Sequence, residues 1–484
     1  MRLYNTLTRR EEEFVPKEEG IVRMYACGPT VHDRFTIANA RAFLTFDVLR
    51  RYLEFKGYKV IYTQNITDIE DRIIKKGQAL GIPAQEVALR FTEAFFEDRA
   101  LLGIAPPTYQ PRATEMIPQI IEFTQDLLAK GYAYTSDGSV YYRVRRFPDY
   151  GKLSGKDLEE LEVGARVEVD ERKEDPLDFA LWKASKPEEP SWESPWGRGR
   201  PGWHIECSVM AMATLGETLD IHGGGADLIF PHHENEIAQS EARTGKPLAR
   251  FWVHNGLVMV GEQEMHKSLG NFEYAKDVVA RYGKEAVRLF FLSKHYRKPV
   301  NFTHEALEEA KAAVERVYNL LEELEFELER HDGQGLNEAG LTERGREFLN
   351  CLNTVRAEFE REMDADLNTA GALGVIFELV RRANAFKQEL ADNDLPLLRR
   401  AAELIRELGK PLGLFQEEPK LRAQLAGLQE ELVALLIEVR DELRAQREFA
   451  LADRIRARLN ELGIELRDKG GGTRWHLRPQ GKEQ

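Results

Sequence analysis

The sequence predicts an α/β protein built on a parallel sheet, followed by an α-helical bundle and a small C-terminal unit. Strand-like and helix-like stretches alternate in the first third of the chain, which is the rhythm of βαβ units with right-handed crossovers. After residue 303, long stretches carry apolar residues at every third or fourth position among many charged ones. That pattern is typical of packed amphipathic helices.

The first α/β segment is expected to run from the N-terminus to about residue 130. Its expected elements are strands at 21–26 and 59–64 and helices at 38–55, 83–102 and 113–130. Residues 132–143 alternate around Asp137-Gly138, which indicates a hairpin. The chain from there to about residue 201 is rich in charge, proline and tryptophan and lacks a helical period, so we interpret it as an insertion.

A second α/β segment begins near Trp203. A strand at 218–222 is followed by Gly223-Gly224-Gly225, and the next elements are a helix at 231–243 and a strand at 251–260. The long bundle helices include 306–329 and 342–363. A final unit, about 418–475, contains two helices and then a short hairpin that turns at Gly470-Gly471-Gly472.

Composition limits the class of protein. With 484 residues, 42% of them apolar, the chain can bury several cores, which excludes a disordered or collagen-like polymer. Three cysteines are too sparse for a disulfide framework and suit a reducing compartment. The sequence shows neither a targeting segment nor a run of about 18 apolar residues, so we expect a cytoplasmic protein that does not bind membranes.

The charge is uneven along the chain. The net charge of −14 argues against a protein that simply coats nucleic acid. From Arg440 to the end, 11 basic and 8 acidic residues give a net charge of +3. This end is either a solvated helical face or a surface that meets RNA.

Four separated residues have the chemistry of zinc ligands. His232 and Glu236 are four apart, so a helix presents both on one face. Cys207 precedes them, and Cys27 ends a predicted strand of the first half. Cysteine, histidine and carboxylate all bind zinc, and parallel sheets bring strand ends together. The alternative is a buried inert cysteine beside a surface helix.

Other motifs are absent or weak. His222-Gly223-Gly224-Gly225 is similar to an esterase oxyanion loop, but the chain has no Gly-x-Ser-x-Gly elbow. Neither the metalloprotease helix motif nor a phosphate-loop motif occurs. The glycines would let a ligand approach the backbone closely. A loop with Lys267 and Ser268 could neutralise phosphate.

Several long segments, in order, resemble cysteinyl-tRNA synthetases over essentially the full chain. The matching segments are YNTLTR at 4–9, CGPTV at 27–31, NITDI at 65–69, RPGWHIECS at 200–208, DIHGGG at 220–225 and FPHHENEIAQS at 230–240. The resemblance implies a class I synthetase that activates L-cysteine with ATP and Mg²⁺ and transfers it to tRNA(Cys). We also expect a monomer.

The resemblance assigns roles to particular residues. It implies one Zn²⁺ per subunit, held by Cys27, Cys207, His232 and Glu236. Because serine and cysteine differ by one heavy atom, a zinc–thiolate contact would separate them better than pocket size. The implied substrate-binding residues are Cys27, Gly28, Thr67, Trp203 and His222. The implied ATP-binding residues include Gly224 and Asp227, the latter at the ribose.

Two ATP motifs depart from the family pattern. The first, His-Ile-Gly-His or His-Ile-Gly-Asn, aligns with Thr36-Ile37-Ala38-Asn39, and the methyl group of Ala38 could interfere with adenine. The second, Lys-Met-Ser-Lys-Ser, aligns with Glu264-Met265-His266-Lys267-Ser268, in which the second lysine is kept but the first lysine has become Glu264 and the first serine His266. The residues expected to act in catalysis are Thr36, Asn39 and Lys267. We favour an active enzyme.

The resemblance also divides the chain by role. It implies a Rossmann-type catalytic domain at 1–130 and 201–250, interrupted by a connective insertion at 131–200. Residues 251–302 would form the ATP-motif loop and stem-contact region, 303–417 a tRNA-binding helical bundle, and 418–484 an anticodon-recognition domain.

Two alternatives remain at this point. One is a ligase that joins cysteine to a non-tRNA acceptor, against which the C-terminal unit argues. The other is a tRNA- or cysteine-binding module with a defective ATP site. Cys351 matches no motif and is expected to be a buried thiol.

Overall fold

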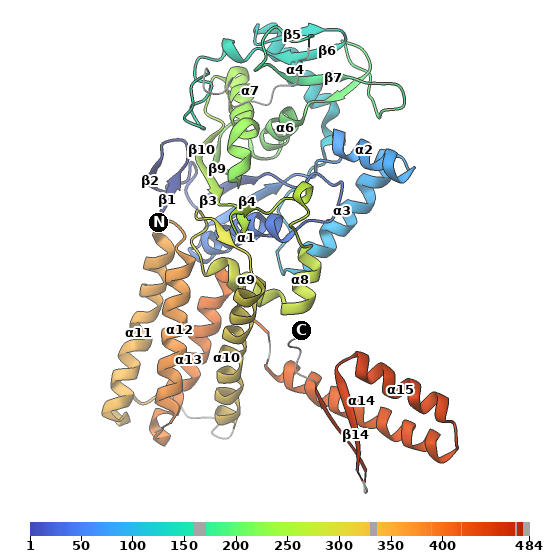
Figure 1. The fold of residues 1–484 in the computed structure, drawn as a ribbon. Helices are drawn as coiled ribbons and strands as arrows, with labels where there is room; N and C mark the ends of the chain where they lie inside the picture. Colours follow the sequence, from blue (N-terminus) through green and yellow to red (C-terminus); the bar gives the residue numbers. More distant parts are fainter. Residues whose placement is uncertain (159–170, 330–335, 389, 418, 470–471, 478–484) are drawn as a thin grey trace. The chain divides into compact units, whose positions relative to one another are not determined.

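A four-stranded parallel sheet lies at the centre of the first part of the chain, with the strand order β10-β9-β3-β4. The computed structural model (Figure 1) describes all residues except 159–170, 330–335, 389, 418, 470–471 and 478–484. The four strands are β3 (Ile21–Ala26), β4 (Lys59–Gln64), β9 (Leu219–Gly225) and β10 (Ala249–Asn255). The predicted α/β fold with a parallel sheet is confirmed.

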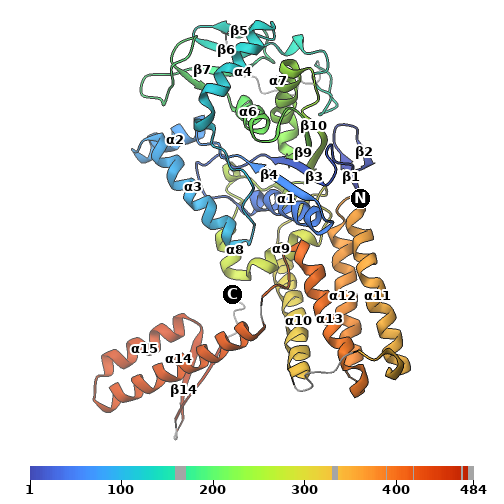
Figure 2. The ribbon, with the colours of Figure 1, turned by 180° about the vertical axis from the view of Figure 1, so that it is seen from behind.

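Both faces of this sheet are buried. In β3, Val22, Met24 and Ala26 join one apolar core, whereas Tyr25 joins another. Alternate residues of a strand face opposite sides, so the two cores lie on the two faces. Helix α1 (Ile37–Phe55) packs in the first core, and α6 (Trp203–Leu215) packs in the second (Figure 2).

Three helices follow β4 along the chain. They are α2 (Asp71–Leu80), α3 (Ala84–Leu101) and α4 (Ile117–Ala129). The sequence pattern does not predict α2, because a glycine in its last turn weakens the helical signal. The structure explains that glycine. A Cβ at Gly77 would lie 2.8 Å from the carbonyl oxygen of Ile82, so only glycine allows the tight turn into α3.

The predicted insertion contains a four-stranded antiparallel sheet in the order β5-β6-β7-β8. Its strands are β5 (Ala133–Ser136), β6 (Ser139–Tyr142), β7 (Phe179–Ala184) and β8 (Gly199–Pro201). The hairpin predicted around Asp137-Gly138 is confirmed, and both turn residues have positive φ values, 46° and 75°. Those values fit the turn that joins right-twisted strands.

Two predicted elements differ from the observed ones near the ends of the central strands. The glycines at 223–225 lie within β9 and not after it. The predicted helix at 231–243 begins later, as α7 (Glu234–Thr244), and follows a wide turn at Ile229–His233 that contains a cis Phe230–Pro231 bond. The pattern of apolar residues does not encode either feature, because glycine and proline set the backbone there.

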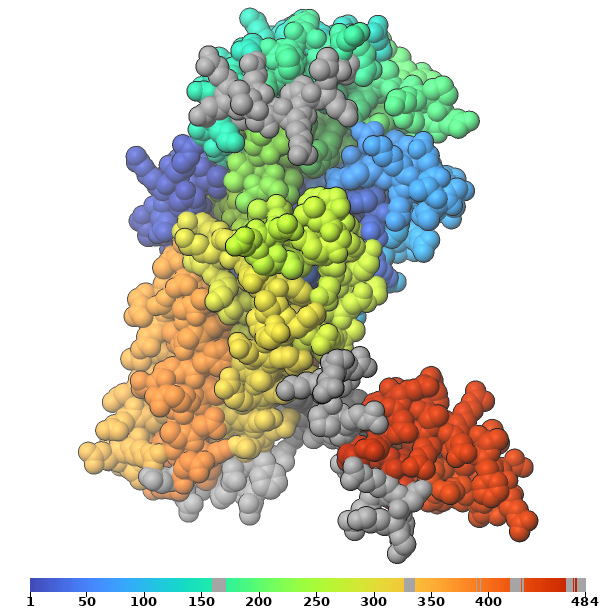
Figure 3. All heavy atoms as spheres, viewed as in Figure 1, coloured from blue at the N-terminus to red at the C-terminus, as the bar shows by residue number. Residues whose placement is uncertain are grey.

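The predicted strand at 251–260 is two strands in two sheets. After β10 ends, β11 (Val258–Val260) pairs with β12 (Gln263–Glu264) and β13 (Val300–Asn301). Helices α8 (Ala275–Tyr282) and α9 (Lys284–Leu292) lie between them in the chain. In the space-filling view (Figure 3), this yellow-green to yellow segment lies between the blue N-terminal part and the orange helices.

Four long helices follow. They are α10 (His304–Glu329), α11 (Glu343–Asp364), α12 (Thr369–Lys387) and α13 (Leu395–Gly409), and they lie side by side in both ribbon views. Their apolar stripes meet in one core that includes Leu352, Phe359, Ile376 and Leu398. The predicted helical bundle is therefore confirmed, and its helices begin and end within two residues of the predicted bounds 306–329 and 342–363.

The described chain divides into two compact units, Met1–Gln416 and Glu417–Gln484. The second contains α14 (Pro419–Ala445), α15 (Phe449–Glu461) and the antiparallel hairpin of β14 (Ile464–Lys469) and β15 (Gly472–Leu477). Val433, Leu459, Ile464 and Leu466 form its core. The two helices and the hairpin are confirmed; two residues of the predicted turn, Gly470 and Gly471, lie outside the described residues.

Candidate metal centre and nucleotide site

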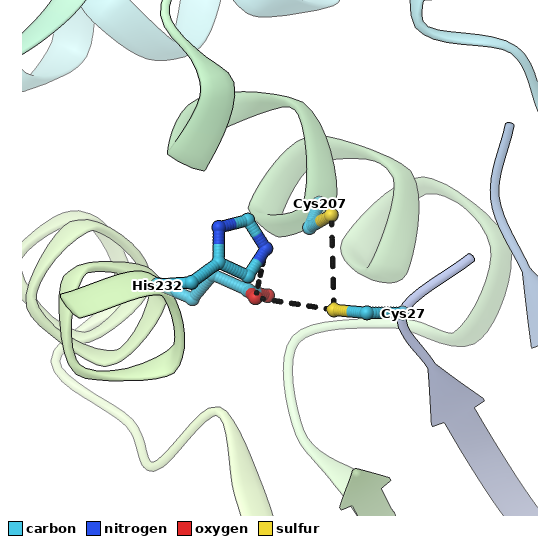
Figure 4. A group of neighbouring side chains, drawn as sticks. Cys27, Cys207 and His232 are labelled. Atoms are coloured by element: carbon cyan, nitrogen blue, oxygen red, sulfur yellow. Dashed lines mark hydrogen bonds and ion pairs between the residues drawn. The ribbon is translucent and has the colours of Figure 1, made fainter. Parts of the chain in front are cut away.

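Four ligand side chains from different elements meet at the carboxyl ends of the central strands. Cys27 directly follows β3, Cys207 lies on α6, His232 lies in the wide turn, and Glu236 lies on α7. One ligand atom from each of the four lies within 4.8 Å of the others. The close-up in Figure 4 shows the side chains of Cys27, Cys207 and His232 pointing toward one point. These residues could hold a metal ion.

The spacing of these atoms suits a tetrahedral ion. Ligand atoms bound to zinc at about 2.0–2.3 Å lie about 3.3–3.8 Å apart. The Sγ atoms of Cys27 and Cys207 are 3.9 Å apart, and Cys27 Sγ lies 3.6 Å from Glu236 Oε1. His232 Nε2 lies 3.1 Å from the same oxygen. Two thiols, an imidazole and a carboxylate form a donor set that favours zinc over hard cations.

The electrostatics of the group also suit a cation. Burial, with Cys207 and Glu236 nearby, raises the pKa of the Cys27 thiol. The hydrogen bond from Cys27 lowers the pKa of Cys207 to about 6. A divalent ion would supply the positive charge that offsets the raised pKa of Cys27 and stabilises both thiolates.

Further histidines, which the sequence reasoning did not single out, surround the four ligands. His204 Nδ1 lies 2.9 Å from His232 Nδ1, and His233 Nε2 lies 3.2 Å from Cys27 Sγ. His233 Nδ1 lies 2.7 Å from His254 Nε2, and burial lowers the pKa of His254 to about 3. Such partners orient metal ligands and fix their tautomers. In the sequence, the adjacent pair His232-His233 was the one feature that could have indicated a second histidine at this group.

The predicted substrate residues occupy two different environments. The ring of Trp203 stacks on that of His232, with centroids 4.4 Å apart, and so lies against the ligand group. His222, in contrast, is fully buried, and its Nε2 lies 2.8 Å from Glu236 Oε2. The structure therefore places His222 as a partner of a ligand and not on an open surface.

Gly28 allows a close approach between two strand ends. Its N–H donates to Asn65 Oδ1 at 2.7 Å, and a Cβ there would lie only 1.7 Å from the carbonyl oxygen of Asn65. Asn65 Nδ2 in turn donates to Thr67 Oγ1 at 3.1 Å. Gly28 thus lets the backbone at Asn65 lie close to the end of β3, and the side chain of Asn65 in turn binds the buried Thr67.

Gly28→Ala is expected to displace the segment at 65–67 and to destabilise the protein by about 1–3 kcal/mol, as overpacking does. Gly374→Ala is the matched control, because a Cβ at this helical position meets nothing within 4 Å. Thermal unfolding of both variants measures the difference. Equal midpoints would contradict this account of Gly28.

The first ATP motif caps a helix. Thr36 is the N-cap of α1, and only 5% of it is exposed. Its Oγ1 accepts from the N–H of Asn39 at 3.4 Å and donates to Asn39 Oδ1 at 3.1 Å. Asn39 Oδ1 also accepts from the N–H of Thr36. The hydroxyl expected to serve ATP is therefore engaged in a capping box, while Asn39 is exposed and Ala38 half-buried.

Backbone hydrogen bonds join the start of the first ATP motif to the segment that follows the second. The N–H of Ile37 donates to the carbonyl of Glu273 at 2.9 Å, and that of Ala275 donates to Phe35 at 3.2 Å. Within the loop, Met265 is buried, while His266 and Ser268 are exposed, with His266 Nδ1 2.9 Å from Ser268 Oγ. The N-terminus of α1 is therefore held against the segment at 273–275.

Gly224 and Asp227 lie at the end of β9 and just after it. A Cβ at Gly224 would lie 2.9 Å from Leu228 Cδ1 and 3.0 Å from His233 Cε1, so the glycine lets the end of β9 pack closely. Asp227 follows the end of β9 and is exposed. Both residues lie at the carboxyl edge of the sheet, where ligands bind in open α/β sheets.

Comparison with known families identifies the chain. Residues 13–312 match the model of the tRNA synthetases class I (C) catalytic domain. The chain belongs to the class I aminoacyl-tRNA synthetases. Residues 358–416, within the helical bundle, match the DALR domain. A class I synthetase activates an amino acid with ATP and Mg²⁺ and charges tRNA with it.

Solved structures of other class I synthetases share the fold. The methionyl-tRNA synthetase of Mycobacterium tuberculosis in complex with methionyl-adenylate matches with a TM-score of 0.64 and 15% identity, over 81% of this chain and 91% of that one. A putative arginyl-tRNA synthetase from Campylobacter jejuni matches with a TM-score of 0.58 and 14% identity, over 83% and 94%.

A third similar structure is the LeuRS of Agrobacterium radiobacter K84 in a ternary complex with tRNA and LeuAMS. Its TM-score is 0.61 at 11% identity, over 83% of this chain and 85% of that one. These synthetases differ in amino acid, so the likeness concerns the fold. Among the residues that the structure describes, none of the helices is long and apolar enough to span a membrane.

Proposed function

We propose that this class I synthetase activates L-cysteine and transfers it to tRNA(Cys). The observation that carries the proposal is the convergence of Cys27, Cys207, His232 and Glu236 at the strand ends, with Trp203 stacked against them. The fold is shared with synthetases for other amino acids, so the choice of cysteine depends on this group and on the sequence resemblance.

A zinc ion held by the four residues would supply a soft Lewis-acid contact for the thiolate of the substrate. A pocket that distinguishes serine from cysteine by size alone would discriminate poorly, because small differences in shape are worth only about 1–3 kcal/mol. Thiolate ligands, in contrast, are strongly preferred by zinc over hydroxyl groups. The side chain of Trp203 would close the pocket on the outer side.

The ATP site is proposed to lie between the N-terminus of α1 and the loop at 264–270. The first N–H groups of a helix favour phosphate, and Lys267 of the loop reaches the carbonyl oxygen of Arg34, two residues before the N-cap of α1. In the reaction, a carboxylate oxygen of the amino acid bonds to the α-phosphorus while the bond to the β-phosphate breaks. Pyrophosphate leaves with Mg²⁺, and Lys267 would stabilise its charge.

The remaining domain assignments are proposed from the chain order. The bundle at 303–417 and the small unit at 418–484 would bind the tRNA, the latter at the anticodon. The unit at 418–484 carries the basic stretch that begins at Arg440, and phosphate contacts need a local basic surface and not a basic protein. All three cysteines are free, which is consistent with a cytoplasmic location.

Amino-acid-dependent exchange of labelled pyrophosphate into ATP tests the proposal. With zinc-loaded protein we expect exchange with cysteine and at least about 100-fold less with serine, methionine, arginine or leucine. Exchange with another amino acid would overturn the assignment of cysteine. The absence of exchange with all five would indicate a binding module, and exchange without charging of tRNA(Cys) would indicate a ligase with another acceptor.

A further inference from the structure

The loop that contains the second ATP motif has a single lysine and no arginine. Lys267 is the sole lysine or arginine between residues 251 and 275, and the position of the first motif lysine is taken by Glu264. Any contribution of this loop to neutralising polyphosphate therefore comes from Lys267. The position of Lys267 relative to the polyphosphate therefore matters more than it would in a loop with two lysines.

Two residues just before α1, Asp33 and Arg34, contact the ammonium group of this lysine. Lys267 Nζ lies 2.9 Å from Asp33 Oδ2 and donates to the carbonyl oxygen of Arg34 at 2.7 Å. Asp33 is itself fixed, because Oδ1 accepts from the N–H of Arg34 at 2.9 Å and Oδ2 accepts from Tyr274 Oη at 3.2 Å. About a quarter of the Lys267 side chain and a fifth of the Asp33 side chain are exposed, so the pair is partly shielded from water.

We propose that Asp33 is a positioning residue for the activation step: it holds Lys267 beside the N-terminus of α1, where the polyphosphate of ATP is expected. The loop that contains Asp33 leads directly into Thr36, the N-cap of that helix. Asp33, three residues before the first ATP motif, thus contacts Lys267 of the second, in addition to the backbone bonds at Ile37 and Ala275. The inference rests on the ATP-binding role proposed for Lys267.

The surrounding charges explain why a counter-ion is needed there. Burial lowers the pKa of Lys267, Asp33 opposes that effect, and Lys76 and Arg72 on α2 lower the pKa further. His32 lies in the same neighbourhood, and Tyr274 meets the pair through Asp33. Without the carboxylate, like charges would repel Lys267 and its ammonium group would lose its proton at lower pH.

Asp33→Asn tests the proposal, with Asp277→Asn as the matched control. Asp277 pairs with Lys276 on the exposed surface of α8, so its loss is expected to change nothing. For Asp33→Asn we expect the kcat of pyrophosphate exchange to decrease about tenfold, because a displaced catalytic group is costly. The dissociation constant for ATP·Mg²⁺, measured by calorimetry, should change less than about threefold.

Two further readouts separate positioning from general damage. The alkaline limb of the kcat–pH profile should move to lower pH in Asp33→Asn, since the pKa of Lys267 decreases, and Asp33→Glu should recover part of the rate. Backbone hydrogen exchange over 264–271 should accelerate. An unchanged kcat, or tighter ATP binding because Lys267 is released, would overturn the inference.

A second control keeps this test separate from the proposed function. If Lys267→Ala leaves exchange unchanged, the ATP-binding role of Lys267 itself is wrong. If Lys267→Ala reduces exchange and Asp33→Asn does not, only the positioning role of Asp33 is wrong.

Discussion

Cys207→Ser is expected to remove the bound zinc and, with it, cysteine-dependent activation. Cys207 is buried on α6, with its Sγ 3.9 Å from that of Cys27. Loss of even an outer partner of a ligand typically weakens metal binding about 10–100-fold, and loss of a ligand itself should cost at least that much. We expect zinc content to decrease from one ion per chain to near zero after dialysis, as measured by elemental analysis.

The chain provides a matched control for this substitution. Cys351 lies on α11, is half-buried and belongs to no group of ligand residues among those described. Its half-burial also departs from the buried thiol predicted from the sequence. Cys351→Ser should retain full zinc content and exchange activity. If Cys207→Ser kept its zinc, or if both serine variants lost it equally, the ligand assignment would be wrong.

Lys267→Ala is expected to reduce pyrophosphate exchange by about 10²–10³-fold, the typical cost of removing one group that stabilises charge in a transition state. The expectation follows from the sequence, in which no second lysine or arginine occurs between 251 and 275. Zinc content should be unchanged, because Lys267 is not among the ligand residues. Steady-state exchange with saturating cysteine and varied ATP measures the effect.

Lys276→Ala is the control for Lys267→Ala. Lys276 lies nearby in the sequence, on α8, and its side chain is 38% exposed in a surface ion pair with Asp277. Surface pairs of this kind contribute about 0–1 kcal/mol, so exchange should remain near the wild-type rate. If Lys267→Ala were equally active, the altered motif would have lost its role in binding ATP.

Local patterns in the sequence predicted the fold well. The strands at 21–26 and 59–64, the helix that connects them and the hairpin at Asp137-Gly138 all depend on short-range periodicity and turn chemistry. The α2 helix was missed because Gly77 weakens its signal, although that glycine closes the turn into α3. The wide turn before α7 was missed because its geometry depends on Pro231 and not on a repeating pattern.

Thr36 shows what residue-by-residue alignment leaves out. Aligned with the first histidine of an ATP motif, it was expected to donate a hydrogen bond to ATP. In the structure its hydroxyl caps α1 in a reciprocal box with Asn39, and its hydrogen bond to ATP stays a prediction. A threonine before a helix is a favoured cap, so the local signal was present in the sequence, but the family pattern pointed elsewhere.

The sequence by itself determined the parallel sheet and the bundle and singled out the four candidate ligand residues, since these follow from periodicity, residue chemistry and segment resemblance. The tertiary structure alone decided which side chains support them. His204, His233 and His254 reach the ligand group from a helix, a turn and a strand, and Asp33 meets Lys267 across more than two hundred residues of chain. Such pairings depend on which strands and loops lie next to one another in the fold, as in the strand order β10-β9-β3, and the local pattern of one segment does not specify its partners far along the chain.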